Sequence, residues 1–270
     1  MAKQGLNELA EDVFRTAAMA TKEAFVTEPT VAGALKLTAM LAKFADDSAD
    51  FAVRTGLPEE KPACRRGCTS CCYLHVVALP AEVIAIASFL VRTLSSAEMD
   101  TLRRRLNTHI EATTGLVAAD RRRVRLPCPL LDGNGDCRAH AVRPLSCRGW
   151  NSLDASLCDA DRLDPSRDNP ARLNLTQYVL AGRILEGLAA GTSANGRDHR
   201  RLDLVRALRV VLDDPGAVEK WVSGEDVFDI AANERVFPEP EDEEATVTRE
   251  RLWSSLGPGF STSTTSKNSS

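Results

Sequence analysis

Apolar residues recur at three- and four-residue intervals over residues 7–26 and 30–55, with polar residues between them. This period predicts two amphipathic helices. Pro29 separates them, because proline disrupts the interior of a helix. The apolar positions are Leu9, Val13, Phe14, Ala17, Ala34, Leu37, Leu41 and Phe44. We expect a helical hairpin that packs on the segment after it.

Short extended and helical patterns alternate in the middle of the chain. Residues 74–79 predict a short strand, and Pro80 suits the first turn of a helix that runs to about residue 94. Ser95 or Ser96 then caps a helix that runs to about residue 116.

The segment PCPLLDGNGDCRAH predicts two short strands around an Asp-Gly-Asn-Gly turn, since glycine and asparagine readily adopt positive φ. This hairpin is expected to bring Cys128 and Cys137 together. Arg143-Pro144 then predicts a turn or short helix that carries Cys147, followed by a loop to Cys158.

The last third of the chain is predicted to be helical and then disordered. A helix is expected from Pro170 through Leu188, closed by Gly191, followed by helices over residues 200–212 and 217–222. Beyond about Phe237 the composition is acidic and then rich in serine and threonine, which predicts a disordered tail.

These patterns together predict a mainly α (α+β) fold, a helical domain with a cysteine-rich loop and a small β-hairpin insert that holds metal. The expected organisation is a helical hairpin over residues 1–60, a cysteine-cluster region over 61–160 and C-terminal helices over 161–236. The tail takes up residues 237–270.

All eight cysteines lie in one stretch, in the order C-x3-C-x2-C-C and then C-x8-C-x9-C-x10-C. Thiolate sulfur binds zinc, copper(I) and iron–sulfur centres in preference to magnesium or calcium. Two groups of four sulfurs would fill two four-coordinate sites, either of zinc or of 4Fe-4S clusters. The predicted metal ligands are Cys64, Cys68, Cys71, Cys72, Cys128, Cys137, Cys147 and Cys158.

The spacing favours an iron–sulfur cluster over zinc, because zinc sites usually pair two C-x2-C knuckles and the second half here has gaps of eight to ten residues. Cys71 and Cys72 are expected to point apart and to serve different centres, or one of them to lie outside the ligand set. The spacing C-x3-C-x2-C also occurs in radical S-adenosylmethionine enzymes. Here Ser70 stands where an aromatic residue is expected, and no series of strands follows.

Disulfide pairing and redox-active thiols are the competing interpretations of the cysteines. The first residues, MAKQGLNELAEDVF, contain neither an apolar h-region nor a small-residue cleavage site, so we expect a reducing, cytoplasmic location. Eight cysteines in 270 residues are also far below the cysteine density of a disulfide scaffold.

Charge and hydropathy limit the partners. The chain has no run of 18 apolar residues, which predicts no membrane span. Net charge is −4, yet residues 62–150 contain 13 arginines, no lysine and 7 carboxylates. We interpret the arginine runs 103–105 and 121–125 as solvated helix faces rather than phosphate contacts, so nucleic acid is disfavoured. A protein partner or substrate is left unidentified.

Several side chains near the cysteines are further candidates. His75 and His140 are candidate ligands or proton donors, or else structural histidines. Arg143 and Arg148 flank Cys147 and would hold thiolates charged, or pair with a nearby aspartate. The candidate aspartates are Asp132, Asp136 and Asp154, and Trp150 is expected to shield the centre from water.

The stretches CRRGCTSCC and PCPLLDGNGDCRAHAVRPLSCRGWNSLDASLC resemble the YkgJ-like cysteine-cluster family, zinc- or iron-chelating proteins with a CxxCxxCC domain. The resemblance covers Cys64 to Cys158 and includes the Arg-Pro before Cys147, although C-x3-C precedes C-x2-C-C here. It implies zinc or iron–sulfur binding. One branch, the flagellin lysine N-methylases, is associated with methyl transfer that uses an iron–sulfur centre.

Three roles follow from a metal at these cysteines. In a binding module the metal staples irregular loops. In an enzyme, one centre would keep an exchangeable position and act with S-adenosylmethionine in methyl transfer or in redox chemistry. In a sensor, reversible loss of the centre would change partner binding.

Overall fold

The computed structural model describes residues 5–57, 61–65, 67–116, 118–164 and 172–228, all within one compact unit. It confirms a mainly helical fold with a small antiparallel sheet. The tail predicted over residues 237–270 and the helix start predicted at Pro170 lie outside the described residues.

The α-helices are α1 (Leu6–Thr27), α2 (Val31–Arg54), α3 (Pro80–Thr93), α4 (Ser96–Thr113), α5 (Ala118–Arg123), α6 (Leu145–Gly149), α7 (Ala155–Leu163), α8 (Leu175–Ser193), α9 (Leu204–Asp213) and α10 (Ala217–Val222). Two short 3₁₀ helices are η1 (Ser70–Tyr73) and η2 (His140–Val142), and the strands are β1 (Val77–Ala78) and β2 (Leu202–Asp203).

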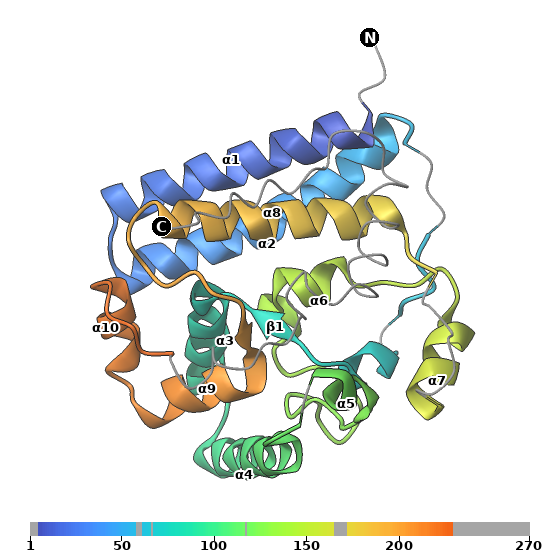
Figure 1. The fold of residues 1–270 in the computed structure, drawn as a ribbon, viewed down its shortest axis with the longest axis vertical. Coiled ribbons are helices and arrows are strands. Elements are labelled where there is room, and N and C mark those ends of the chain that lie inside the picture. Colours follow the sequence, from blue (N-terminus) through green and yellow to red (C-terminus); the bar gives the residue numbers. More distant parts are fainter. Residues whose placement is uncertain (1–4, 58–60, 66, 117, 165–171, 229–270) are drawn as a thin grey trace, which may run out of the picture. The chain divides into compact units, whose positions relative to one another are not determined.

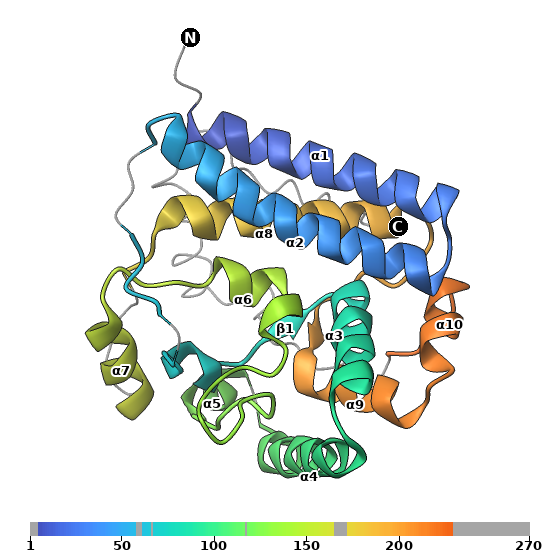
Figure 2. The same ribbon diagram turned by 180° about the vertical axis from the view of Figure 1, so that it is seen from behind.

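The three long helices α1, α2 and α8 pack together (Figures 1 and 2). The predicted hairpin of α1 and α2 is confirmed, and the Thr30 hydroxyl caps α2 by accepting the Gly33 N–H at 3.1 Å. α8 lies along α1 and also contacts α2, so helices from both ends of the sequence share one core.

Two glycines let α8 approach α1 closely. A Cβ at Gly187 would lie 2.6 Å from the Phe14 carbonyl oxygen, and one at Gly191 would lie 2.5 Å from the Thr21 Cβ. The prediction that Gly191 closes this helix is therefore wrong, because Gly191 lies inside a helix that continues to Ser193. The turn comes at Gly196, whose φ is +68°.

The two-stranded sheet is not formed by the predicted hairpin. Residues Val77 and Ala78 pair antiparallel with Asp203 and Leu202, so the sheet joins segments far apart in the sequence. In the predicted hairpin segment only one bridge forms among the described residues, between Leu131 and Cys137.

The turn that this bridge encloses has the conformation that its sequence predicts. The Asp132 carboxylate accepts the backbone N–H groups of Asn134 and Asp136 at 2.8 and 2.9 Å. Gly135 has a φ of +80°, a conformation that glycine adopts without steric cost.

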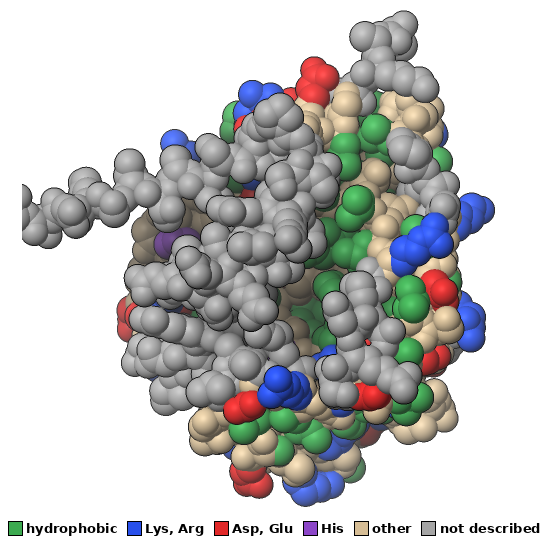
Figure 3. Space-filling model, turned by 45° about the vertical axis from the view of Figure 1, so that its right-hand side comes forward, with side chains coloured by type: hydrophobic (Ala, Val, Ile, Leu, Met, Phe, Trp, Pro, Cys, Tyr) green, Lys and Arg blue, Asp and Glu red, His purple; other side chains and the backbone are tan. Residues whose placement is uncertain are grey.

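Three arginines of the basic runs turn inward, so the prediction of solvated faces is wrong for them. Arg103 donates to the Leu212 carbonyl at 2.7 Å, Arg105 donates to the Leu131 carbonyl, and Arg121 is buried against Asp203. Figure 3 shows basic and acidic side chains interspersed along the edges of the face in view. None of the described helices is long and apolar enough to cross a membrane.

Candidate metal centre

Four thiols form a connected group, which we call the inner quartet: Cys71, Cys128, Cys137 and Cys147. Every pair among them interacts electrostatically. They come from three places in the fold, which are η1, the loop around the Leu131–Cys137 bridge, and α6. Thiols from segments that are far apart in the sequence therefore lie close together in the fold.

Backbone hydrogen bonds bring the first and second cysteine clusters together. The Cys128 N–H donates to the Cys72 carbonyl at 2.7 Å, which holds the second cluster against η1. The Leu131 N–H then donates to the Cys128 carbonyl at 3.0 Å, and the bridge from Leu131 to Cys137 returns the chain beside Cys128. The predicted proximity of Cys128 and Cys137 is therefore confirmed, although it rests on a single bridge.

Cys147 lies in the predicted short helix, α6, whose first turn is held by two other elements. The Leu145 N–H donates to the Glu82 carboxylate of α3 at 2.7 Å. The Ser146 hydroxyl donates to the Val77 carbonyl of β1 at 2.7 Å. Both neighbours on the N-terminal side of Cys147 are thus fixed from outside α6.

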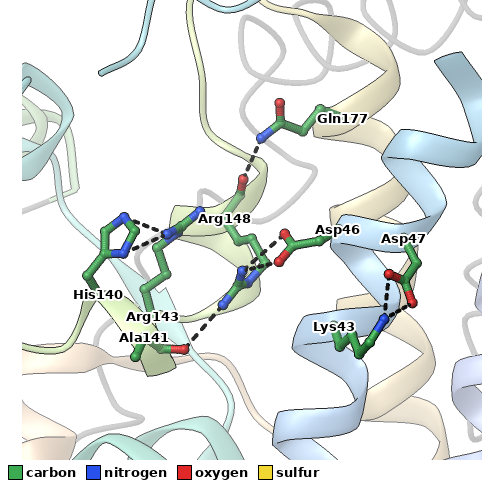
Figure 4. A network of polar contacts seen from close by, with 8 residues as sticks. All are labelled: Lys43, Asp46, Asp47, His140, Ala141, Arg143, Arg148 and Gln177. Carbon is green, nitrogen blue, oxygen red and sulfur yellow. Dashed lines mark hydrogen bonds and ion pairs between the residues drawn. The ribbon is translucent and has the colours of Figure 1, made fainter. Parts of the chain in front are cut away.

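The two residues after Cys147 attach α6 to the long helices (Figure 4). The Arg148 guanidinium donates to both Asp46 oxygens of α2, at 2.8 and 3.0 Å, and the Gln177 amide of α8 donates to the Arg148 carbonyl at 2.9 Å. A Cβ at Gly149 would lie 2.7 Å from the Ala181 Cβ of α8. Arg148 thus pairs with an aspartate, but not with one of the three that the sequence suggested.

Three more thiols form a second group, the outer trio: Cys64, Cys68 and Cys158. They interact electrostatically with one another, and Cys64 and Cys158 also interact with Cys71. Ser152 lies between two of them, since its carbonyl is 4.0 Å from the Cys64 sulfur and it hydrogen-bonds to the Cys158 thiol.

The segments of the outer trio are held by Ser152 and by η1, which carries Cys71. The Ala63 N–H donates to the Ser152 carbonyl at 2.7 Å, and the Ser70 hydroxyl donates to the Asp159 carboxylate of α7. Arg162 of α7 lies over the ring of Tyr73, 5.2 Å from its centroid. Cys158 lies within α7 and not in the predicted loop.

Gly67 lies in the turn that leads to Cys68. Gly67 has a φ of +79°, and the Cys68 N–H donates to the Arg65 carbonyl at 2.9 Å. The Cβ of another residue would strain this conformation.

Cys71 and Cys72 do not point apart as expected. They lie in the 3₁₀ turn η1, where their thiols hydrogen-bond to each other. Cys72 contacts Cys71 but is assigned to neither group, so we describe it as a neighbour of the inner quartet.

Burial keeps most of these thiols protonated. It raises the pKa of Cys128 to about 11 and raises the pKa of Cys147 well above its usual value. The hydrogen bond from Cys72 is the largest cause of the raised pKa of Cys71. A bound cation would reverse this preference, because it stabilises thiolates.

Arg143 acts as a cation on two thiols of the inner quartet, as Arg105 does on Cys128. The charge of Arg143 works against the raised pKa of Cys71 and of Cys137, as one of the two roles predicted for it requires. Its guanidinium also lies 2.6 Å from the His140 Nε2 (Figure 4). Burial, together with the charges of Arg143 and Arg148, lowers the pKa of His140.

The other side chains near the cysteines are engaged elsewhere. The His75 Nε2 lies 2.7 Å from the Asp203 carboxylate, which also pairs with Arg121. Trp150 packs edge-on against Tyr178, with ring centroids 6.1 Å apart. Its expected role as a shield stays a prediction.

Glu82 is the residue that the sequence analysis missed. It is 5 % exposed, and its carboxylate accepts the N–H of Leu79 at 2.9 Å as well as that of Leu145. Burial raises its pKa to about 7. A glutamate two residues after Pro80, at the third position of a helix, is a capping pattern that could have indicated it.

The donor set suits soft metals, since all eight cysteines are free thiols. No group of three or more His, Cys, Asp or Glu side chains among the described residues is already spaced to hold one ion. Metal binding therefore requires the neighbouring thiols to turn toward a common point. The individual ligand assignments stay predictions.

The helical fold and the eight free thiols define a class of protein, in which a helical frame carries a cysteine-rich insert of the kind that binds soft metals. Residues 63–162, which include all eight cysteines, match the CxxCxxCC family model, described as "Putative zinc- or iron-chelating domain". The match leaves α1, α2 and α8–α10 outside it. No curated protein and no solved structure gave a match.

Proposed function

We propose that this protein binds a zinc ion or a 4Fe-4S cluster and that the inner quartet supplies the four ligands. The supporting observation is that four thiols from separate segments are mutual neighbours inside the stretch that matches the chelating family. Both centres take four thiolates, so one donor set suits either. Zinc would cross-link the segments, and a cluster would add a redox couple.

Anaerobic purification of the full chain, followed by a visible spectrum and analysis for iron, zinc and sulfide, tests this proposal. Broad absorbance near ~400 nm with equal iron and sulfide identifies a cluster, and S-adenosylmethionine binding is then the next measurement. A colourless protein with about one or two zinc ions identifies zinc and contradicts the methyl-transfer alternative. A protein that retains neither metal contradicts the proposal.

Cysteine variants connect the metal to the quartet. Cys137→Ser is expected to lose the tightly held metal, because it removes a ligand from the turn beside Cys128. Cys158→Ser is the matched control, since it removes a thiol of the outer trio, which the proposal leaves outside the four ligands. Equal metal loss in both variants would contradict the assignment of the ligands.

A further inference from the structure

We infer that His75, His109, Arg121 and Asp203 form an acid-sensitive latch, which holds two segments of the inner quartet on the helical frame while His109 is neutral and releases them when His109 gains a proton. The inference rests on the proposed function only in what the latch regulates, which is metal binding by these segments. The contacts of Asp203, the contact of His109 and the balance of charge between them carry it.

Asp203 holds the chain that follows η1. Its side chain is 0 % exposed, and one of its carboxylate oxygens lies 2.7 Å from the His75 Nε2 and pairs with the buried Arg121 guanidinium. The other oxygen accepts the Arg206 N–H at 2.8 Å, which caps α9. The pairing of β1 with β2 strengthens the same attachment. These contacts fix the end of the segment that carries Cys71.

His109 holds the segment that leads to Cys128. It lies on α4, and its half-buried ring hydrogen-bonds to the carbonyl of Pro127, directly before Cys128. The Cys128 N–H in turn donates to the Cys72 carbonyl at 2.7 Å, so the two segments are joined to each other. The latch therefore secures both sides of this junction, with Asp203 on one side and His109 on the other.

The surroundings of His109 oppose its protonation. The charged and titratable groups that act on it are His75 before β1, Arg121 of α5 and Asp203 before α9, and the charge of Arg206 acts on Arg121. Both oxygens of the Asp203 carboxylate are already engaged by other groups. Burial, together with Arg121 and His75, lowers the pKa of His109 in spite of Asp203. A proton on His109 thus favours the open segment, in which the ring reaches water.

The direction of the effect follows from proton linkage. In the closed segment the pKa of His109 lies below 6.5, the ordinary value for histidine, to which it returns in the open segment. Between the two values the open form binds more protons, so the opening equilibrium rises by up to about tenfold for each pH unit that the pH falls. Metal affinity falls with it, beyond the loss that thiol protonation causes.

The test is hydrogen–deuterium exchange of the reduced, metal-free full chain at about pH 7.5 and about pH 5.5, corrected for the intrinsic exchange rate. In the wild type, the peptide that contains the Cys128 N–H is expected to lose up to about tenfold in protection at the lower pH. His109→Gln keeps an N–H donor but cannot gain a proton, so its protection should be the same at both pH values. His199→Gln, at an exposed position, is the matched control and should behave as the wild type.

A nuclear magnetic resonance titration of the wild-type chain gives a second measurement, which serves even if circular dichroism shows that His109→Gln is unfolded. The ring signals of the four histidines are followed, and the titration of His109 should coincide with the loss of protection. Equal loss of protection in the wild type and His109→Gln would overturn the latch. So would a His109 ring that titrates at or above 6.5.

Zinc titrations of the same proteins separate this inference from the proposed function. Zinc affinity should fall more steeply towards low pH in the wild type than in His109→Gln, and the titration of groups common to both proteins cancels in the comparison. Equal slopes would overturn regulation by the latch while leaving the proposed function intact. A chain that binds no metal would overturn the proposed function, whereas the exchange measurement on the metal-free chain would still decide whether the latch opens.

Discussion

Replacing Glu82 by glutamine is expected to remove a loss of stability that the wild-type chain suffers as pH rises. The Glu82 carboxyl is 5 % exposed and joins the first turns of α3 and α6 through Leu79 and Leu145. Burial raises its pKa from 4.5 to about 7. The folded chain therefore holds a proton there that the unfolded chain releases at lower pH.

The sign and size follow from this difference. Between pH 4.5 and about 7 the folded chain binds one more proton than the unfolded chain, so the free energy of unfolding falls as pH rises, and it is level above that window. At about 1.4 kcal/mol for each pKa unit, the full loss is about 3 kcal/mol. Glutamine does not titrate, so the variant lacks this contribution.

Urea unfolding of both proteins at about pH 5 and about pH 7.5 measures the effect. The variant is expected to gain about 2–3 kcal/mol relative to the wild type between the two pH values. Metal binding and the other carboxyls also respond to pH, but effects common to both proteins cancel in the difference. A difference that is constant, or that moves the other way, would refute the argument.

Glu98→Gln is the matched control. Glu98 also stands at the third position of its helix, and its carboxylate accepts the Ser95 N–H at 2.9 Å, the same distance as in the Glu82 contact with Leu79. The hydrogen bond from Arg138 is the largest cause of its pKa of about 2. Its contribution is therefore lost only as pH falls below about 4.5, so this variant and the wild type should keep a constant difference between the two assay conditions.

Further tests concern the packing of α8 on α1, Arg143 beside the thiols, and the protonation of the thiols. Gly187→Ala is expected to destabilise the fold by about 1–3 kcal/mol because its Cβ would clash with α1. Gly182→Ala, with nothing within 4 Å, should instead stabilise by about 0.5–1 kcal/mol, and urea unfolding compares the two. Arg143→Gln should weaken zinc binding about 10–100-fold in competition titrations. Arg65→Gln, at an exposed position of the same cysteine-rich segment, should leave zinc binding unchanged. Equal losses of zinc affinity in the two variants would contradict the role of Arg143. Since the pKa of Cys128 is about 11, zinc binding must displace protons from the ligand thiols. Zinc affinity should therefore rise about tenfold per pH unit for each ligand thiol between about pH 6.5 and about pH 8. A pH-independent affinity would contradict thiol ligation.

Local sequence patterns predicted the helices well because their causes are local. The apolar period located α1 and α2 within a few residues, and Pro80 and Ser95 located the starts of α3 and α4. Gly191 was misinterpreted because a glycine that ends a helix and one that lets another helix approach look alike in one sequence. Only the position of α1 beside α8 distinguishes them.

The site was predictable in its chemistry and not in its grouping. The spacing of the cysteines indicates thiol ligands, but which thiols meet depends on non-local contacts such as that between the Cys128 N–H and the Cys72 carbonyl. The pairing of Arg148 with Asp46 has the same origin, since the two residues lie on helices that meet only in the folded chain. Glu82 was missed even though its capping position was readable, because its second contact, with Leu145, is non-local.

The division between helical frame and cysteine loops determines what a metal contributes. A chain of this length buries a core without metal, and the contacts that fix α6 come from helices and a strand that already belong to that core. Cys147 is thus placed by the fold, whereas Cys71, Cys128 and the outer trio are placed by loops and short helices. The entropy lost on metal binding therefore comes mostly from those loops. It follows that changes in the loops should alter metal affinity more than they alter the stability of the long helices.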